Sequence, residues 1–402
     1  MPAPLEGLRV IDWTIWQQGP VASMMLGDLG AEVIKIESRD GGDPGRGLVA
    51  MGGEGSDRPN FYFEANNRNK QSLTLDLKQP EAREIVHKLA EVSDVFVQNY
   101  RKGVAERLGL GYEALSARNP KLIYANATGY GPEGPDAGEP SFDQLGLARS
   151  GIMFAAGEPD MPPLPIGGGI ADQMGAVLLA YGVLAAVVAR ERFGVGQVVD
   201  ASHLGSMSFL QGLSLTSKLI NGAAFPRMAR AKTFNPLWNH YRCGDDQWIA
   251  VGMLQPDRYW ADFCKAIGRP ELGTDERFAS MGARAGNAEA CIAILDEVFA
   301  SQPRAHWMEA LRSGGDFIYT VVNRVDDLPE DPQMLANDYI VEIEHPSHGP
   351  TRYVGVPVRL SETPGAVRSA APEHGQHSEL LLTELLGYSW DEVGALRERG
   401  VI

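Results

Sequence analysis

The chain has 402 residues, 44% of them hydrophobic and 22% charged, which is typical of a globular protein with one large core or two domains. Its 52 acidic and 36 basic side chains give a net charge of −16, which argues against a general nucleic-acid-binding protein. An anionic small ligand stays compatible with this charge, because it needs only a local basic pocket.

The cysteines and the N-terminus bear on the compartment. Cys243, Cys264 and Cys291 are widely spaced and form no CxxC pair, which indicates a reducing environment. The N-terminal residues lack the pattern of a secretory signal, and the longest apolar run, residues 175–189, is shorter than the roughly 20 residues that span a bilayer. We therefore expect a cytoplasmic protein without a membrane or nucleic-acid partner.

The first half of the chain alternates expected strands and helices. A buried strand over 8–13 precedes a turn, a helix over 21–29 and a second strand over 31–37, which together form a βαβ unit. The alternation predicts a large α/β domain with a doubly wound parallel sheet. Further strands are expected over 72–77, 95–99, 122–127 and 197–201, a Gly- and Asp-rich loop over 39–57, and further helices over 81–92, 141–150 and 175–189.

The pattern changes after a predicted helix over 207–221. Residues 227–241 are basic and aromatic, and we interpret 225–330 as a second, smaller α/β domain that follows a large domain over 1–224. The remaining expected elements are a strand over 248–253, helices over 256–267 and 287–300, a Gly/Pro-rich strand pattern at 355–358 and a helical region over 378–399.

Several motifs are absent, and they exclude classes of enzyme. The turn after the first strand lacks GxGxxG, and residues 129–134 match that spacing but contain Pro132, which prevents the helix that must follow. No P-loop and no GxSxG sequence occurs, so a dinucleotide-dependent dehydrogenase, phosphoryl transfer and a serine nucleophile lack support. The histidine pairs 345/348 and 374/377 have no third ligand at a fixed spacing, and no metal site is predicted.

A glycine run with one carboxylate stands out. Gly167, Gly168 and Gly169 precede Asp172, and a long apolar helix follows directly. Glycines let a ligand approach the backbone closely, and the start of a helix favours negative charge. From these residues alone two interpretations stay open: Asp172 is an ordinary helix cap, or it is a reactive acid.

Basic and amide side chains gather where the predicted strands end. The carboxyl ends of parallel strands meet at one edge of a sheet, which is where open α/β sheets bind ligands. Basic groups there, on an acidic protein, indicate a phosphate-bearing ligand. The side chains concerned are Lys35, Arg39, Lys78, Asn99, Arg101 and Arg107.

These residues lie within a longer pattern, and the chain resembles the family III CoA-transferases over essentially its whole length. Nine fragments occur in the family's order. They are LEGLRVIDW (5–13), QGPVASMMLGDLGAEVIKIE (18–37), NRNKQSLTLDLK (67–78), DVFVQNYRKGVAERLGL (94–110), NPKLIYANATGYGPEGP (119–135), FDQLGLARSG (142–151), GGGIADQMGA (167–176), RFGVGQVVDAS (192–202) and LLGYSWDEVGALRERGVI (385–402).

The resemblance implies site residues and an assembly. Asp172 matches the catalytic nucleophile, Gln17 a residue that helps hold the reacting carbonyl, and Asp143 a second acid near the nucleophile. It also implies an interlocked homodimer whose large domain is completed by residues 331–402, with a CoA thioester as substrate and no permanently bound cofactor. The residues expected at the CoA site are Arg39, Leu75, Lys78, Asn99, Arg107, Gly168 and Gly169.

Other functions on the same fold stay open. An acyl-CoA racemase would need a histidine immediately before Asp143, where this chain has Phe142, and none of the eight histidines lies near that position in sequence. An isomerase that moves CoA within one diacid would use the same Asp172, and a non-catalytic acyl-CoA-binding subunit is a further alternative. Arg227, Arg230 and Lys232 either frame a larger acceptor acid or form a solvated basic segment between domains.

Overall fold

The computed structural model describes residues 2–52 and 58–402, and its chain divides into two compact units. Unit 1 comprises Met1–Met153, Pro165–Ala224 and Gln333–Ile402, and unit 2 comprises Phe154–Leu164 and Phe225–Pro332. This division differs from the predicted domains in the segment Phe154–Leu164. The segment belongs to unit 2, where the Arg227 guanidinium donates hydrogen bonds to the carbonyls of Phe154 (3.0 Å) and Met161 (2.5 Å).

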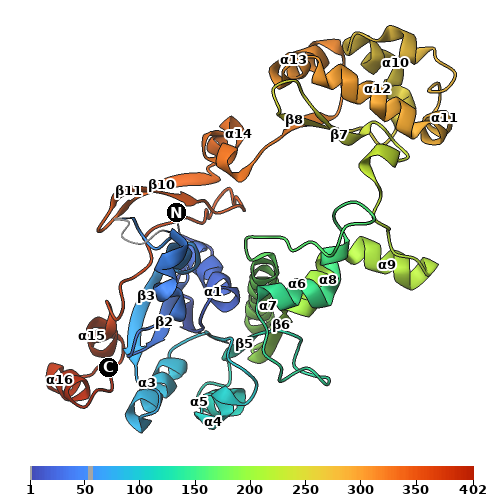
Figure 1. The fold of residues 1–402 in the computed structure, drawn as a ribbon. Coiled ribbons are helices and arrows are strands. Elements are labelled where there is room, and N and C mark those ends of the chain that lie inside the picture. Colours follow the sequence, from blue (N-terminus) through green and yellow to red (C-terminus); the bar gives the residue numbers. More distant parts are fainter. Residues whose placement is uncertain (1, 53–57) are drawn as a thin grey trace. The chain divides into compact units, whose positions relative to one another are not determined.

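Unit 1 is built on a six-stranded, wholly parallel sheet with the order β3-β2-β1-β4-β5-β6 (Figure 1). The order turns back between β1 and β4, which is the arrangement of a doubly wound fold. The predicted α/β class and parallel sheet are confirmed. The strands are β1 (Arg9–Trp13), β2 (Glu32–Ser38), β3 (Lys70–Leu75), β4 (Val95–Gln98), β5 (Ile123–Thr128) and β6 (Gln197–Ser202).

Helices and short 3-10 turns connect these strands. The helices are α1 (Gln18–Asp28), α2 (Phe61–Asn67), α3 (Pro80–Glu91), α4 (Val104–Arg107), α5 (Tyr112–Arg118), α6 (Asp143–Ser150), α7 (Ile170–Phe193), α8 (His203–Leu210) and α9 (Gly212–Asn221), and the 3-10 turns are η1 (Pro44–Gly52) and η2 (Ile152–Phe154). The predicted Gly- and Asp-rich loop contains η1, and its residues 53–57 lie outside the described range.

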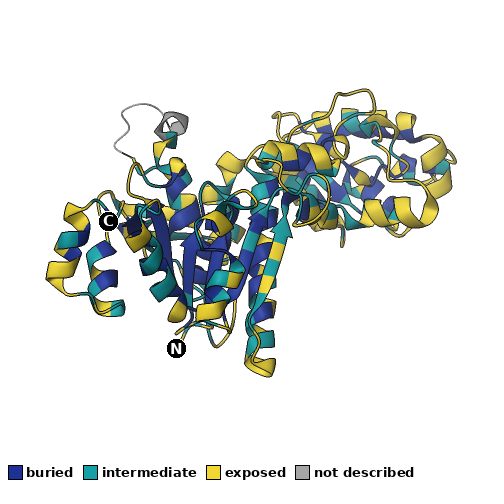
Figure 2. Cartoon of the chain, turned by 90° about the horizontal axis from the view of Figure 1, so that it is seen from below, coloured by how far each residue is buried: buried dark blue, intermediate teal, exposed yellow. Residues whose placement is uncertain are grey.

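Successive side chains of each strand point to opposite faces of the sheet, so the sheet has a core on each face. On one face, strand residues such as Val10 pack with Leu26 of α1 and Leu179 of α7. On the other face, residues such as Ile11 pack with Leu89 of α3. Figure 2 shows that the central strands are almost entirely buried.

The C-terminal segment completes unit 1. Its elements are α14 (Pro332–Ala336), the antiparallel hairpin β10 (Ile340–His345) and β11 (Gly349–Val354), α15 (Ser378–Leu380), the π-helical turn η6 (Leu381–Leu385) and α16 (Trp390–Glu398). Leu382 and Leu396 are buried in the core beside α3. The strand pattern expected at 355–358 is wrong, because pairing ends at Val354.

Unit 2 is a smaller layer of helices on a three-stranded antiparallel sheet. Its core is aromatic, with Tyr241 stacked on Phe299 and Phe299 packed on Trp307. The strands are β7 (Trp238–Arg242), β8 (Trp248–Gly252) and β9 (Tyr319–Val322); the helices are α10 (Pro256–Ala266), α11 (Met281–Gly286), α12 (Ala288–Ala300) and α13 (Arg304–Gly314); the 3-10 turns are η3 (Arg230–Lys232), η4 (Pro270–Gly273) and η5 (Val325–Glu330).

Two helices after β5 differ from their predicted extents. The helix expected over 207–221 is two helices, α8 and α9, because Gln211 has φ −93° and ψ 18° and breaks the path between them. The apolar helix α7 has 24 residues rather than the 15 of the run at 175–189. Within the described residues α7 is the one helix long and apolar enough to cross a membrane, and its inner face is buried against the sheet.

Candidate active site

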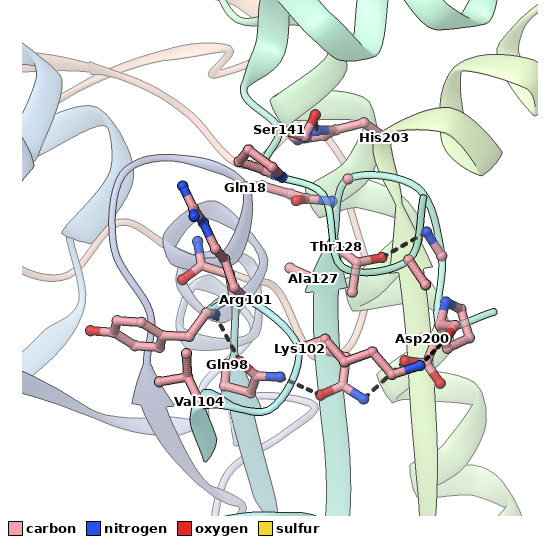
Figure 3. A pocket seen from close by; sticks show the side chains of 18 of the residues that line it. Gln18, Gln98, Arg101, Lys102, Val104, Ala127, Thr128, Ser141, Asp200 and His203 are labelled. Atoms are coloured by element: carbon pink, nitrogen blue, oxygen red, sulfur yellow. Dashed lines mark hydrogen bonds between the residues drawn. The ribbon is translucent and has the colours of Figure 1, made fainter. Parts of the chain in front are cut away.

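Unit 1 contains a cavity of about 770 Å³ at the carboxyl ends of β1, β4 and β5. The turns after β1 and β4 both line it, so the cavity lies where the strand order turns back, the position at which doubly wound sheets bind ligands. Figure 3 shows Ser141 and His203 side by side at one end of the cavity, and Gln98, Lys102 and Asp200 toward the other end.

Side chains from other parts of the chain form hydrogen bonds with the main chain of the turn after β1 and hold it in place. The Asn99 amide donates to the Ile15 carbonyl (2.7 Å) and accepts from the Ile15 N–H (2.9 Å), which joins the turns after β1 and β4. The next residue, Trp16, has φ +68°, and its N–H donates to the Asp43 carboxylate. Because non-glycine residues rarely adopt positive φ, these bonds keep the turn in a conformation that presents Gln17 to the cavity.

A buried ion pair supports the same turn. The Lys35 ammonium is fully buried, lies 2.8 Å from the Asp43 carboxylate and donates to the Thr14 carbonyl (2.9 Å). Burial lowers the pKa of Lys35, but Asp43, Asp12 and Glu37 outweigh that effect and raise it, so the amine keeps its charge. Lys35, which the sequence analysis placed among possible ligand-binding cations, is therefore occupied within the chain.

Asp172 lies in the first turn of α7, three residues after the helix cap. Gly169 is the N-cap, with φ +70°, and a β-carbon there would overlap the Gln17 side chain. Asp143 supplies the missing cap, because its Oδ1 accepts the N–H of Ala171 (2.6 Å) and of Asp172 (3.2 Å). The interpretation of Asp172 as an ordinary helix cap is wrong, and its carboxylate is left for other contacts.

The described contact of the Asp172 carboxylate is with a histidine. His203 Nε2 lies 2.8 Å from Asp172 Oδ1, and the imidazole is 4% exposed, whereas the Asp172 side chain is 15% exposed. Ser141 Oγ lies 3.2 Å from His203 Nδ1, on the far side of the ring. Since an ionised carboxylate can only accept hydrogen bonds, Nε2 carries the hydrogen in this pair.

Tyr62 is a neutral donor at the same cavity. Burial raises the pKa of Tyr62, and the nearby carboxylates of Asp172 and Asp43 raise it further. Its phenol therefore keeps its proton at neutral pH and can donate a hydrogen bond to a ligand.

The structure brings some of the predicted site residues together and leaves others apart. Gln17 Nε2 lies 3.5 Å from the Gly169 carbonyl oxygen, and Asp143 contacts the backbone of Asp172, so four predicted residues form one cluster. Asn99 and Gly168 adjoin it, through Ile15 and Gly169 respectively.

Besides Gly168 and Gly169, four residues expected at the CoA site do not line this cavity. Arg39 is exposed and donates to the Ile402 carbonyl (3.1 Å), and Leu75 is buried in the core beside α3. Lys78 and Arg107 are exposed, after β3 and in α4 respectively. All four lie at or beyond the carboxyl ends of the strands, and their contact with CoA stays a prediction.

Residues of the site that the sequence analysis missed are His203, Tyr62 and Lys102. His203 is the first residue after β6, so its position past a strand end was a usable signal. Lys102, in the turn after β4, lines the cavity beside Arg101. Tyr62 lies on α2, and its sequence neighbours carry no signal for a site. In the part of the chain that the structure describes, no cluster of three or more possible metal ligands occurs.

The fold and the site together define a doubly wound α/β protein that presents the Asp172 carboxylate to a cavity at the strand ends, whose lining also includes Gln17, Asn99, Arg101 and Lys102. The family model of CoA-transferase family III matches residues 5–378, and the chain belongs to this family. The nine sequence fragments had indicated the same assignment, which is confirmed.

Proteins similar over the full length are named CoA-transferases. The chain is 33% identical to succinyl-CoA–D-citramalate CoA-transferase of Chloroflexus aurantiacus, covering 100% of this chain and 98% of that one. It is also 33% identical to succinyl-CoA:glutarate CoA-transferase of Mus musculus, covering 99% and 90%. Among solved structures, a CAIB/BAIF family protein from Brucella suis aligns with a TM-score of 0.85 and 31% identity, covering 96% of this chain and 100% of that chain.

Proposed function

We propose that this enzyme transfers CoA from an acyl-CoA donor to a carboxylic acid through covalent intermediates on Asp172. The observation that carries the proposal is the placement of the Asp172 carboxylate at the cavity, with one oxygen bonded to His203 and its backbone capped by Asp143. Covalent catalysis divides one difficult transfer into easier steps.

The chemistry needs a nucleophilic carboxylate and fixed hydrogen-bond donors. An oxygen of Asp172 attacks the thioester carbonyl, the C–S bond breaks, and CoA leaves as the thiolate, which gives a mixed anhydride. The thiolate then attacks Asp172 Cγ and expels the donor acid, leaving an aspartyl-CoA thioester. The acceptor acid repeats the two steps in reverse. Gln17 and Tyr62 supply donors beside the reacting carbonyl.

The CoA part of the substrate is expected along the carboxyl edge of the sheet. Arg101 and Lys102 line the cavity there, and basic groups suit the phosphates of CoA. We extend this to the predicted contacts at Arg39, Leu75, Lys78, Asn99 and Arg107, with Gly168 and Gly169 leaving room for the thioester. CoA enters and leaves as a substrate, and no permanently bound cofactor is invoked.

The acceptor is proposed to be a small carboxylic or dicarboxylic acid, because the two relatives are named for succinyl-CoA with citramalate or glutarate. Two cations in the basic segment of unit 2 are already bound to groups of the chain itself, so they are less available to an acceptor acid than their charge suggests. Arg227 donates to main-chain carbonyls, and Arg230 forms an ion pair with Asp296 at 2.5 Å. These contacts favour the structural interpretation for both arginines.

We also propose that the enzyme is an interlocked homodimer. Helix α9 has no buried residue, and Leu213, Leu219 and Ile220 are each more than 75% exposed. Apolar side chains of this size are unfavourable in water and are expected to pack against a second copy. Light scattering of the purified enzyme should give twice the mass of 43.6 kDa, and Leu213→Glu with Ile220→Glu should reduce it to the monomer.

A cytoplasmic location is supported by the three buried thiols.

The test is a transfer screen with purified enzyme. Several acyl-CoA donors, succinyl-CoA and acetyl-CoA included, are incubated with a panel of mono- and dicarboxylic acids, and new CoA thioesters are detected by mass spectrometry. Incubation with donor alone, followed by hydroxylamine and peptide mapping, should modify Asp172. The Asp172→Ala variant is the control and should give neither product nor adduct. Binding of acyl-CoA with no transfer and no adduct would instead support a non-catalytic subunit.

The presence of His203 at the site does not support the racemase alternative. A racemase removes the α-proton with one base and returns it from a second group on the opposite side. His203 is bonded to Asp172 itself, so the two groups lie on one side of any substrate that contacts both. An isomerase acting within one diacid would use the same covalent steps, and the transfer screen distinguishes it by a product with the CoA moved on the same acid.

A further inference from the structure

We infer that His203 is a catalytic residue that stabilises the oxyanion formed on Asp172 itself. This inference rests on the proposed function, since it concerns the steps in which Cγ of Asp172 is the atom under attack. His203 was not among the predicted site residues, and its role comes from its contact with one oxygen of the carboxylate, Oδ1.

The two oxygens of Asp172 are in different environments. Oδ1 accepts the hydrogen bond from His203 Nε2 at 2.8 Å, and Oδ2 has no hydrogen bond to any residue that the structure describes. The free oxygen, Oδ2, is therefore the nucleophile. In the anhydride that it forms, Oδ2 becomes the bridging oxygen, and Oδ1 becomes the carbonyl oxygen of Asp172, still facing the imidazole N–H.

The next steps place negative charge on Oδ1. When the CoA thiolate attacks Cγ of the anhydride, the C=O electron pair moves onto Oδ1, then returns as the bond from Cγ to Oδ2 breaks and the donor carboxylate leaves with that pair. When an acceptor carboxylate attacks Cγ of the aspartyl thioester, the pair again moves onto Oδ1 and returns as the C–S bond breaks. His203 stabilises both oxyanions through one hydrogen bond, and no proton is transferred.

The imidazole is fixed for this task before the reaction starts. Ser202 caps α8, which begins at His203, and the Leu204 N–H donates to the Gly129 carbonyl (3.0 Å). A β-carbon at Gly146 of α6 would lie only 2.7 Å from His203 Cβ, so the histidine packs in the space left by the missing side chain of this glycine. A donor that is rigid and buried needs no reorganisation as charge develops, which is what makes oxyanion donors effective.

Replacing His203 by Leu tests the inference, because Leu still fills the space beside Gly146 and removes the hydrogen-bond donor. Attack on the substrate carbonyl does not use Oδ1 as an oxyanion, so the first anhydride still forms, whereas both steps at Cγ slow. We expect transfer to fall about 10²–10³-fold, the usual cost of one oxyanion donor. The anhydride should then persist, lose CoA and hydrolyse, so the ratio of donor hydrolysis to transfer should rise more than tenfold.

His203→Gln is the matched control. Its side-chain N–H can reach the position of Nε2, and it should recover transfer to within about tenfold of the wild type, with the hydrolysis ratio restored. Both variants are first checked for thermal unfolding and for CoA affinity. Borohydride reduction of the donor-treated enzymes, followed by peptide mapping, measures how much aspartyl thioester each one forms.

The outcomes separate the inference from the proposed function. A wild-type enzyme that transfers no CoA to any acid overturns the proposed function, and the inference with it. Wild-type transfer that needs Asp172, together with a folded His203→Leu variant whose hydrolysis ratio is unchanged, overturns the inference alone. A variant that keeps transfer and loses hydrolysis also overturns it, because His203 would then be a base for water. If His203→Leu does not fold, His203→Gln is the test. A ratio of donor hydrolysis to transfer in His203→Gln that differs from the wild-type ratio then counts against the inference.

Discussion

Two carboxylates of unit 1, the buried Asp12 and the partly exposed Asp172, differ in how many hydrogen bonds the chain donates to them. Asp12 on β1 is fully buried, accepts from Lys70 Nζ (2.7 Å) and Ser23 Oγ (2.8 Å) on one oxygen, and accepts from Thr14 on the other. The Asp172 carboxylate accepts one hydrogen bond from the residues that the structure describes, that of His203, and it lies at a cavity. A carboxylate whose two oxygens both accept hydrogen bonds, which we call saturated, stabilises the fold. A carboxylate with a free oxygen at a cavity is available for chemistry.

The buried charged side chains around Asp12 include Lys35 and Glu37 on β2 and Lys70 on β3, and we call them the saturated cluster. Burial raises the pKa of Asp12, but the charges of Lys70 and Lys35 outweigh it and lower the pKa overall. Breaking a buried ion pair leaves an unpaired charge, which costs far more than the pair contributes when intact. The chain thus uses costly buried charges on one side of the turn after β1 to fix the position of Gln17 on the other.

Exchanging one carboxylate at a time for an amide should give opposite results at the two sites. We expect Asp172→Asn to lower transfer by at least about 10⁴-fold, with the free energy of unfolding changed by less than about 1 kcal/mol. Asp12→Asn should cost about 3–5 kcal/mol of stability, because Lys70 loses its partner. Chemical denaturation and the transfer assay measure both; a stable Asp12→Asn variant would contradict the comparison.

Acid should weaken the saturated cluster of unit 1. Burial raises the pKa of Glu37, but its bonds to Arg46 and the charge of Lys35 outweigh this and lower it to about 2. A lowered folded-state pKa gives stability that is present above the ordinary value of 4.5 and is lost as the pH falls toward 2. We expect a loss of about 3 kcal/mol over that range from this residue.

Denaturation at pH 6, 4 and 3 measures this effect. Glu37→Gln is the control: it is expected to be less stable than the wild type at pH 6 and to lose less stability on acidification. Equal slopes for the two proteins would show that another group controls the acid response.

The close approach of Gln17 to Gly169 predicts a smaller effect on catalysis. Gly169→Ala forces a side chain into φ +70° and into the space of Gln17, so we expect a loss of about 1–2 kcal/mol and a roughly tenfold lower kcat. Gly167→Ala, where a β-carbon meets nothing within 4 Å, is the matched control. Equal rates for the two variants would show that Gln17 does not act from this position.

The smallest predicted effect is at Ser141. Ser141→Ala removes the hydroxyl beside His203 Nδ1, a neutral hydrogen bond worth about 1 kcal/mol, so kcat should fall roughly fivefold with KM little changed. Steady-state kinetics measures the change. A loss as large as that of His203→Leu would mean that Ser141 does more than orient the ring.

Much of unit 1 could be predicted from local pattern. Short apolar runs with helices between them predicted all six strands to within about two residues, and the parallel direction of the strands followed from the connections. The C-terminal hairpin at Ile340–Val354 was missed, since its strands alternate exposed polar residues with few buried ones.

The sequence alone determined the α/β class, the family and the choice of Asp172, because period, turn residues and motif order are properties of neighbouring residues. It could not determine which side chains meet at Asp172. His203 is 31 positions away, and only the parallel pairing of β5 with β6 and the packing of α8 on α7 bring its ring to the carboxylate. Likewise Asp143 caps a helix to which it does not belong. Such contacts depend on the register and close packing of whole elements, so the tertiary structure decided them.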